Sequence, residues 1–194
     1  MSLSLFEREE APAGPDVAYT PARLAASIVA AMQDEGMLHG LTWEPHAGGG
    51  AIVQALEDAR VKWVASTLEP ADSRTLTRRF GREIPARDAL LPCPWTPFTV
   101  LGNPPFSSAG EHVRAALRAV QARPVWTVAM ILPISFGCRQ KHADVFCDVH
   151  WSLWPIGPRP TFTGPGRTEE GTAKTDVGLY VWNHRPVASR VISW

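Results

Sequence analysis

The sequence has few cysteines, no long apolar run and no net charge. Its three cysteines, Cys93, Cys138 and Cys147, are odd in number and stand at no zinc-binding or redox spacing, so we expect neither a disulfide framework nor a structural metal. No apolar run approaches the roughly 20 residues that a membrane-spanning helix needs. The 19 basic residues balance the 19 acidic ones, which argues against a protein held to duplex nucleic acid by a large uniform positive field.

The length and the first residues bound the domain organisation. The start, MSLSLFEREE, carries acidic residues where a secretory signal has a basic and then an apolar region, so we expect a cytoplasmic protein. A chain of 194 residues, 45% of them hydrophobic, is long enough for one core and too short for two ordinary domains with a linker. We expect residues 1–18 to form a mobile arm and residues 19–194 to form a single domain.

Strand-like and helix-like segments alternate along most of the chain, which predicts an α/β domain with a mainly parallel sheet. Thr20 is the expected N-cap of the first helix, with Pro21 at its first helical position. The later segments contain strands without convincing helices between them, so an antiparallel strand pair should finish the sheet. Helices are predicted within residues 19–36, from about residue 50 to residue 59, over 70–81 and over 109–122; strands are predicted at the start of 41–59, and over 61–68, 98–102, 125–132, 146–156, 176–183 and 187–194.

A glycine-rich turn, EPHAGGG at residues 44–50, follows the first predicted strand. In open α/β sheets, ligands bind outside the carboxyl ends of the strands. The glycines let the backbone come close to a ligand, and the next helix offers unpaired amides to a polar group. Such turns are also common as plain structure. Glu44 favours the functional interpretation, because a carboxylate at a strand end is poorly placed for packing and well placed for a cation.

The stretch LGNPPFSS, residues 101–108, ends another predicted strand with an asparagine and two prolines. Proline has no N–H for a sheet, and a residue before proline is pushed away from helical geometry, so Asn103, Pro104 and Pro105 should form a stiff extended segment. Such a segment holds an amide rigidly against a ligand, or it merely ends a strand. Its occurrence together with the glycine turn favours the first interpretation.

The two motifs together resemble those of S-adenosylmethionine-dependent N6-adenine DNA methyltransferases, in particular the short phage-borne kind. The resemblance covers residues 19–183 in motif order. It implies a Rossmann-like class I methyltransferase fold, S-adenosylmethionine as cofactor, and methylation of the N6 amino group of adenine in DNA that is single stranded or has the base flipped out. It also implies a bacterial or phage-infected host cell and a link to restriction and modification.

The resemblance assigns roles residue by residue. The family usually has a carboxylate at the end of its second strand, where it binds the cofactor ribose. In the segment STLEP, the residue-by-residue pattern puts Thr67 at that position, whereas the spacing from the glycine turn favours Glu69. His46, inside the glycine turn, is a further candidate for contact with the cofactor. The pattern of an acid, Pro, two residues, Gly, one residue and Gly is matched by Glu44, Pro45, Gly48 and Gly50; the other implied cofactor-binding residues are Tyr19, Thr20, Pro21, Asp88 and Ala89; and the implied catalytic segment is Asn103, Pro104, Pro105 and Phe106.

An adenine amino nitrogen is a poor nucleophile because the ring shares its lone pair. Acceptors on Asn103 and Pro104 would orient its hydrogens and stabilise the developing positive charge, so no general base is expected. Phe106 is the expected stacking ring for the base. Trp182 is a candidate for the opposite face or a core residue, and Arg159 and Arg167, in or beside the long loop at 157–175, are candidates for phosphate contacts or are solvated. The histidines show no metal-ligand spacing, so no metal is expected.

The sequence offers no stretch long enough for a separate target-recognition domain. We therefore expect relaxed sequence preference, or specificity that comes from a partner. Other enzymes with this kind of motif methylate RNA adenines or protein glutamine amides, because those nitrogens raise the same chemical problem. A non-catalytic binding module that keeps the fold is the remaining alternative.

Overall fold

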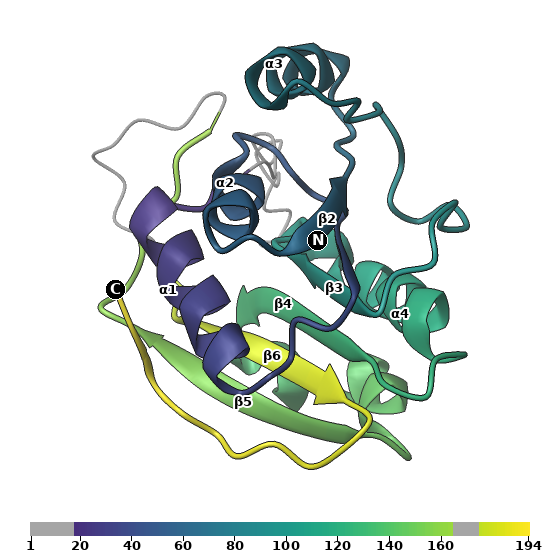
Figure 1. Ribbon diagram of the computed structural model, residues 1–194. Helices are drawn as coiled ribbons and strands as arrows, with labels where there is room; N and C mark the ends of the chain where they lie inside the picture. Colours follow the sequence, from purple (N-terminus) through teal and green to yellow (C-terminus); the bar gives the residue numbers. More distant parts are fainter. Residues whose placement is uncertain (1–17, 165–174) are drawn as a thin grey trace, which may run out of the picture.

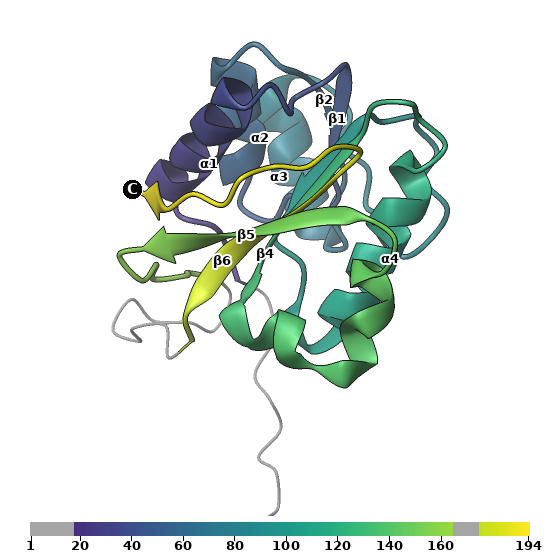
Figure 2. The ribbon, with the colours of Figure 1, turned by 90° about the horizontal axis from the view of Figure 1, so that it is seen from below.

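A seven-stranded sheet runs through the molecule, with helices on both of its faces (Figures 1 and 2). The structure is a computed structural model that describes residues 18–164 and 175–194. The expected mobile arm therefore lies outside the described residues, except for Ala18. The strands are β1 (Leu41–Glu44), β2 (Lys62–Ala65), β3 (Thr99–Gly102), β4 (Thr127–Pro133), β5 (His150–Gly157), β6 (Val177–Asn183) and β7 (Ile192–Ser193).

The strand order is β2-β1-β3-β4-β6-β5-β7. Strands β2, β1, β3 and β4 are parallel, whereas β6 is antiparallel to both β4 and β5. The residues of β3 and β6 are all buried, and so are those of β4 up to its final proline, as near-continuous apolar runs in a sheet covered on both faces require. The predicted fold, a mainly parallel α/β sheet that ends in an antiparallel pair, is confirmed.

The helices are α1 (Ala22–Asp34), α2 (Ala51–Asp58), α3 (Pro70–Phe80) and α4 (Ala109–Val120). The apolar residues of α1 recur at helical spacing, and Leu24, Ile28 and Met32 are fully buried. Helices α1 and α2 pack into one core cluster, and α4 packs into a second, which includes Trp43 and Val100 from the sheet. The core therefore has two layers, one on each side of the sheet.

Two helix ends bear on the predictions made from the sequence. Helix α3 ends at Gly81, the last residue of the range predicted for it, and the left-handed φ of 64° at this position suits a glycine. The expectations that Thr20 is the N-cap and Pro21 the first helical residue are both wrong, because α1 begins at Ala22, its cap position is Pro21, and no side chain caps this end. The Thr20 hydroxyl instead accepts a hydrogen bond from Asn103.

Two short 3-10 helices, Ile134–Cys138 and Gln140–Phe146, follow β4 and were not predicted. They run beside α4, where Arg114 and Asp144 form an ion pair at 2.6 Å. A 3-10 turn has neither the length nor the 3.6-residue period that reveals a helix in a sequence. None of the helices in the described ranges combines the length and the apolar character that crossing a membrane requires.

Candidate active site

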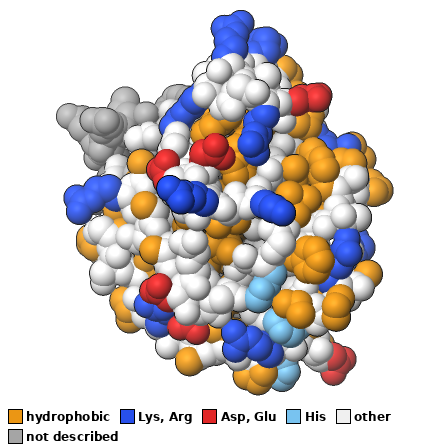
Figure 3. Space-filling model, viewed as in Figure 1, with side chains coloured by type: hydrophobic (Ala, Val, Ile, Leu, Met, Phe, Trp, Pro, Cys, Tyr) orange, Lys and Arg blue, Asp and Glu red, His pale blue; other side chains and the backbone are white. Residues whose placement is uncertain are grey.

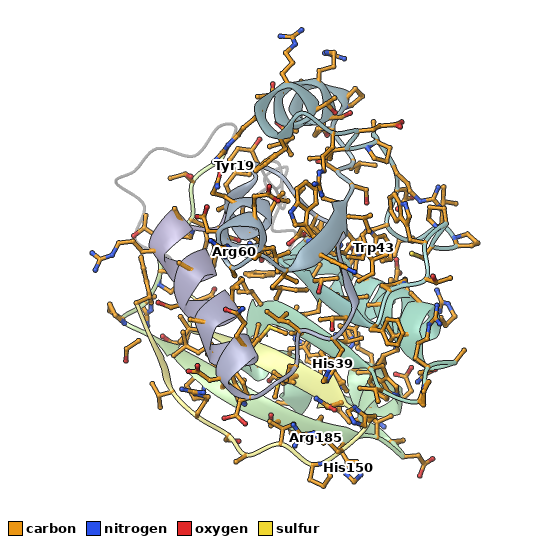
Figure 4. The ribbon with its side chains drawn as sticks, viewed as in Figure 1. Tyr19, His39, Trp43, Arg60, His150 and Arg185 are labelled. Atoms are coloured by element: carbon orange, nitrogen blue, oxygen red, sulfur yellow. The ribbon has the colours of Figure 1, made fainter. Side chains whose placement is uncertain are left out.

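A pocket of about 300 Å³ opens at the carboxyl ends of β1, β2 and β3. The parallel direction of these strands brings segments far apart in the sequence to one edge of the sheet. Figure 4 shows Tyr19 toward the α3 end of the molecule and His39, Arg185 and His150 at the opposite end. The predicted site residues that line the pocket are Tyr19, Pro45, His46, Gly48, Thr67, Glu69, Asp88, Ala89, Asn103 and Pro105.

The ring of Tyr19 lies against the glycine turn. A Cβ atom on Gly48 would lie 2.8 Å from this ring, and one on Gly49 would lie 3.1 Å from it. The Tyr19 hydroxyl donates to the carboxylate of Asp72 on α3 at 3.0 Å, and its backbone N–H donates to the Thr163 carbonyl at 2.6 Å. Burial, and then the Asp72 carboxylate, raise the pKa of Tyr19 to about 12. The two glycines therefore make room for the ring of Tyr19, which packs against the turn and is held there by Asp72 and Thr163. We call this arrangement the Tyr19 clamp.

Glu44 ends β1 and is completely buried. Its Oε1 accepts the backbone N–H of His46 at 2.7 Å, whereas its Oε2 has no hydrogen-bond partner. Burial raises the pKa of this carboxyl to about 8, and the His46 hydrogen bond opposes the rise only in part. A buried carboxyl with one unsatisfied oxygen favours a ligand group that is positively charged and donates hydrogen bonds.

Asn103 follows β3 and is 8% exposed. Its Nδ2 donates to the carbonyl of Ala18 at 2.9 Å and to the hydroxyl of Thr20 at 3.2 Å. Because a backbone carbonyl can only accept, these contacts fix which side of the amide carries the nitrogen. The Oδ1 atom is then left buried and without a partner, and the residue lines the pocket. The site therefore contains a fixed acceptor that lacks a donor.

The residues after Asn103 differ in exposure. Pro104 is buried, and Pro105 lines the pocket. Phe106 starts a 3-10 turn over Phe106–Ser108 and is half-buried, with its ring edge-on to Phe162 at a centroid distance of 6.3 Å. The predicted stacking ring thus lies beside the pocket rather than in its lining.

Both candidates for the second strand end line the pocket. Thr67 is 3% exposed and pairs through its backbone with Ala86. Glu69 is exposed, and its backbone carbonyl accepts the Ser73 N–H at 3.0 Å, whereas its carboxylate has no hydrogen-bond partner among the described residues. Asp88 uses Oδ1 to accept the Leu90 N–H at 2.9 Å, which fixes the turn that holds Ala89 in the pocket wall.

Some of the expected residues lie elsewhere. Trp182 is completely buried in the cluster around Phe136 and does not line the pocket, so it is a core residue. Arg159 is paired with Asp176 at 2.6 Å, and Arg167 lies outside the described residues. Pro21 lines a separate pocket beside Tyr19, and a Cβ atom on Gly50 would lie 2.5 Å from the Leu76 side chain; neither residue lines the candidate site. The part of the chain that the structure describes contains no cluster of three or more potential metal ligands.

The lining residues that were missed from the sequence include Leu68, Asp72 and His112. Leu68 is 65% exposed and gives no signal, because a leucine after a strand is ordinary. Asp72 gains its role from Tyr19, 53 residues away. His112 could have been found from the sequence, because it shares the buried face of α4 with apolar residues such as Val113 and Ala116. A buried histidine needs a hydrogen-bond partner, which marks it as a candidate for a site.

Charged side chains of both signs line the pocket: Arg87 is basic, and Glu69, Asp72 and Asp88 are acidic. Figure 3 shows basic side chains at the tip of α3, where Arg74 and Arg78 are exposed. Glu69 and Asp72, at the start of the same helix, line the pocket. The rim therefore has no single sign of charge.

Replacing Gly102 by alanine tests how tightly the two motifs pack. A Cβ atom there would lie 2.6 Å from Nδ1 of His46 and 3.2 Å from Oε1 of Glu44. We expect a loss of about 1–3 kcal/mol in the free energy of unfolding, because both neighbours are held in a packed interior. Chemical denaturation measures this free energy of unfolding for the variant and the wild type. Gly157→Ala in β5, where nothing lies within 4 Å of the new atom, should not destabilise the protein; equal stability of the two variants would contradict the packing.

No protein-family model and no curated protein matches the sequence. Solved structures do match. The 23S rRNA methyltransferase ErmE has a TM-score of 0.65 at 16% identity, over 86% of this chain and 70% of that one. A dimethyladenosine transferase from Plasmodium falciparum has a TM-score of 0.60 at 13% identity, over 86% and 62%. A Vibrio vulnificus protein described as a modification subunit of a type I restriction enzyme has a TM-score of 0.59 at 13% identity, over 89% and 46%. At these identities the comparison establishes the fold alone: the chain has the Rossmann-like class I methyltransferase fold.

Proposed function

We propose that this protein transfers a methyl group from S-adenosylmethionine to the N6 amino group of adenine in DNA. The observation that carries the proposal is the amide of Asn103. Its nitrogen is fixed by Ala18 and Thr20, and its oxygen is buried beside the pocket without a donor. An exocyclic amino group supplies the N–H donor that this oxygen lacks.

The residues of the NPPF segment suit an amino group that is conjugated to a ring. An acceptor aimed at one of its hydrogens stabilises the positive charge that develops on the nitrogen. Asn103 is neutral and cannot act as a strong base, so the segment orients the nitrogen and the proton leaves to water. The two prolines keep the acceptors in place before a substrate arrives.

The residues in the pocket, together with Glu44, which adjoins the lining residues Pro45 and His46 without lining the pocket itself, fit S-adenosylmethionine. When bound, this cofactor supplies a methyl group on a positively charged sulfur. Glu44 has a buried oxygen free for the cationic amino group, and Glu69 is an unpaired carboxylate at the rim that suits ribose hydroxyls. Asp88 and Ala89 form the part of the pocket wall that we propose for the adenine ring of the cofactor, and the exposed side chain of Leu68 adds apolar surface to the pocket.

A more specific part of the proposal is that the adenine belongs to DNA. The base must be flipped or unpaired to reach Asn103, and Phe106, beside the pocket, is the ring proposed to stack on it. Arg159 and Arg167 remain candidates for phosphate contacts. A partner would supply any sequence specificity. RNA adenine is the second candidate, because two of the similar structures are described as a 23S rRNA methyltransferase and a dimethyladenosine transferase.

Transfer of a labelled methyl group separates these substrates. Purified protein is incubated with S-adenosylmethionine labelled in the methyl group and, in separate reactions, single-stranded DNA, duplex DNA, total RNA or total protein. We expect label in DNA, with single strands at least as good as duplex, because an unpaired base needs no flipping energy. Label confined to RNA would establish the second candidate, and label confined to protein or to no pool would overturn adenine methylation.

A further inference from the structure

Two histidines meet at the inner wall of the pocket. Nε2 of His46 lies 2.9 Å from Nδ1 of His112, with the ring planes at 78°. His46 belongs to the glycine turn, and His112 belongs to α4, the helix after the NPPF segment. Both line the pocket. This contact therefore ties the turn assigned to the cofactor to the segment assigned to catalysis.

The contact constrains the positions of the ring protons. One of the two facing nitrogens must carry the hydrogen. Nδ1 of His46 is buried without a partner, and an unpaired buried N–H is rarer than an unpaired acceptor. The arrangement in which His46 Nε2–H donates to His112 Nδ1 avoids an unpaired N–H at that atom. The neutral His112 then carries its hydrogen on Nε2, the ring nitrogen that His46 does not contact.

The pair is neutral at pH 7. Burial, and then the neighbouring His112, hold the pKa of His46 well below its usual value. Burial also lowers the pKa of His112, and the carboxylates of Asp88 and Glu111 oppose this change. The charged or titratable groups that face the pair are Glu44 from β1, Asp88 from the segment after α3, and Glu111 from α4 itself.

We propose that the His46–His112 pair is a ligand-contacting element that makes the pocket discriminate between S-adenosylmethionine and its demethylated product, S-adenosylhomocysteine, according to whether the pair carries a proton. The inference rests on the proposed cofactor. The two ligands share the amino, carboxylate and adenosine groups, and they differ in the positive charge on sulfur. A pocket of about 300 Å³ is narrower than the ~10 Å over which salt screens charges, so a charge on the pair acts on the sulfur with little screening. A proton on the pair therefore disfavours the methylated ligand more than the product.

Calorimetry with both ligands from pH 8 to pH 5 tests this. The readout is the ratio of the two dissociation constants, in which the effect of Glu44 largely cancels because both ligands carry the same amino group. For the wild-type protein we expect the ratio of S-adenosylmethionine to S-adenosylhomocysteine constants to rise about fivefold on acidification. In His112→Asn the asparagine keeps a polar atom near the Nδ1 position and cannot take up a proton, and burial still lowers the pKa of His46, so the ratio should stay within about twofold.

His142→Asn is the matched control. His142 is also buried, with an unpaired Nδ1, but it stacks on Phe136 and does not line the pocket, so its ratio should follow that of the wild type. A wild-type ratio that does not change with pH would overturn the inference and leave the proposed function standing. Failure of folded protein to bind either ligand at any pH would overturn the proposed function itself.

NMR titration of the wild-type histidine rings keeps the test independent of how the variants fold. S-adenosylmethionine should lower the titration midpoint of His112 by more than S-adenosylhomocysteine does, because only the former adds a positive charge. Equal midpoints with the two ligands would refute the inference.

Discussion

Replacing Asn103 by alanine is expected to lower the rate of methyl transfer by about 100- to 1,000-fold, the usual loss when one preorganised group that stabilises transition-state charge is removed. The variant loses the acceptor Oδ1, which the structure leaves buried and unpaired, and the contacts of Nδ2 with Ala18 and Thr20. Binding of S-adenosylmethionine should change little, because the proposed role of Asn103 is toward the amino group of the substrate. Single-turnover rates and calorimetry measure the two effects.

Two further variants sharpen this result. Asn103→Asp keeps an acceptor and can accept from the Thr20 hydroxyl, but its second oxygen faces the Ala18 carbonyl, which also only accepts, so its rate should lie between those of the wild type and Asn103→Ala. Asn183→Ala removes another buried asparagine, which contacts Thr127 on β4 away from the pocket, and should leave the rate unchanged. A normal rate for Asn103→Ala, with DNA and cofactor bound, would refute its catalytic assignment.

Replacing Glu44 by glutamine is expected to stabilise the protein and weaken its affinity for the cofactor. A pKa that rises from 4.5 in the unfolded chain to about 8 in the folded one means that the stability associated with the neutral carboxyl is complete below about pH 4.5 and is lost as the pH rises to about 8. The full loss is on the order of 5 kcal/mol. Glutamine has the same shape and never ionises, so denaturation should show similar stabilities at pH 4.5 and a variant several kcal/mol more stable at pH 8.

The same substitution should weaken binding of S-adenosylmethionine by about 10- to 100-fold, the usual worth of a hydrogen bond to a charged group. Wild-type affinity should also fall below pH 8, because the buried carboxyl must release a proton before it can pair with a cation. Glu57→Gln is the control: Glu57 accepts from Trp63 at 2.6 Å outside the pocket, so the variant should bind normally and gain no stability. A Glu44→Gln protein that is less stable at pH 8 would contradict the account.

The order of the helices and strands and many of the site residues could be predicted from local patterns in the sequence. The apolar period of α1, the Gly81 stop and the apolar runs of the strands depend on neighbours in the chain, and so does the NPPF motif. Two motifs at the ends of parallel strands must meet at one edge of the sheet, and Glu44 and Asn103 end β1 and follow β3 there. Topology alone therefore brought these groups close together.

What the sequence did not predict depends on contacts between distant residues. The Tyr19 clamp needs Asp72 and Thr163, and His46 needs His112, 66 residues away. Trp182 could not be assigned from the sequence for the same reason. The local sequence around a tryptophan on a late strand is the same whether its side chain faces a ligand or the core. Only the packing of Phe136 and its neighbours placed it in the interior.

Analysis of nucleosides from cellular DNA tests the central claim most directly. The protein and its Asn103→Ala variant are expressed at equal levels in bacteria that lack adenine methylation of their own, and N6-methyladenine is measured by mass spectrometry of the digested DNA. The account predicts N6-methyladenine in DNA from cells with the wild-type protein and its near absence with the variant. DNA adenine that stays unmethylated in cells containing the folded wild-type protein, or equal methylation by the two proteins, would contradict the account.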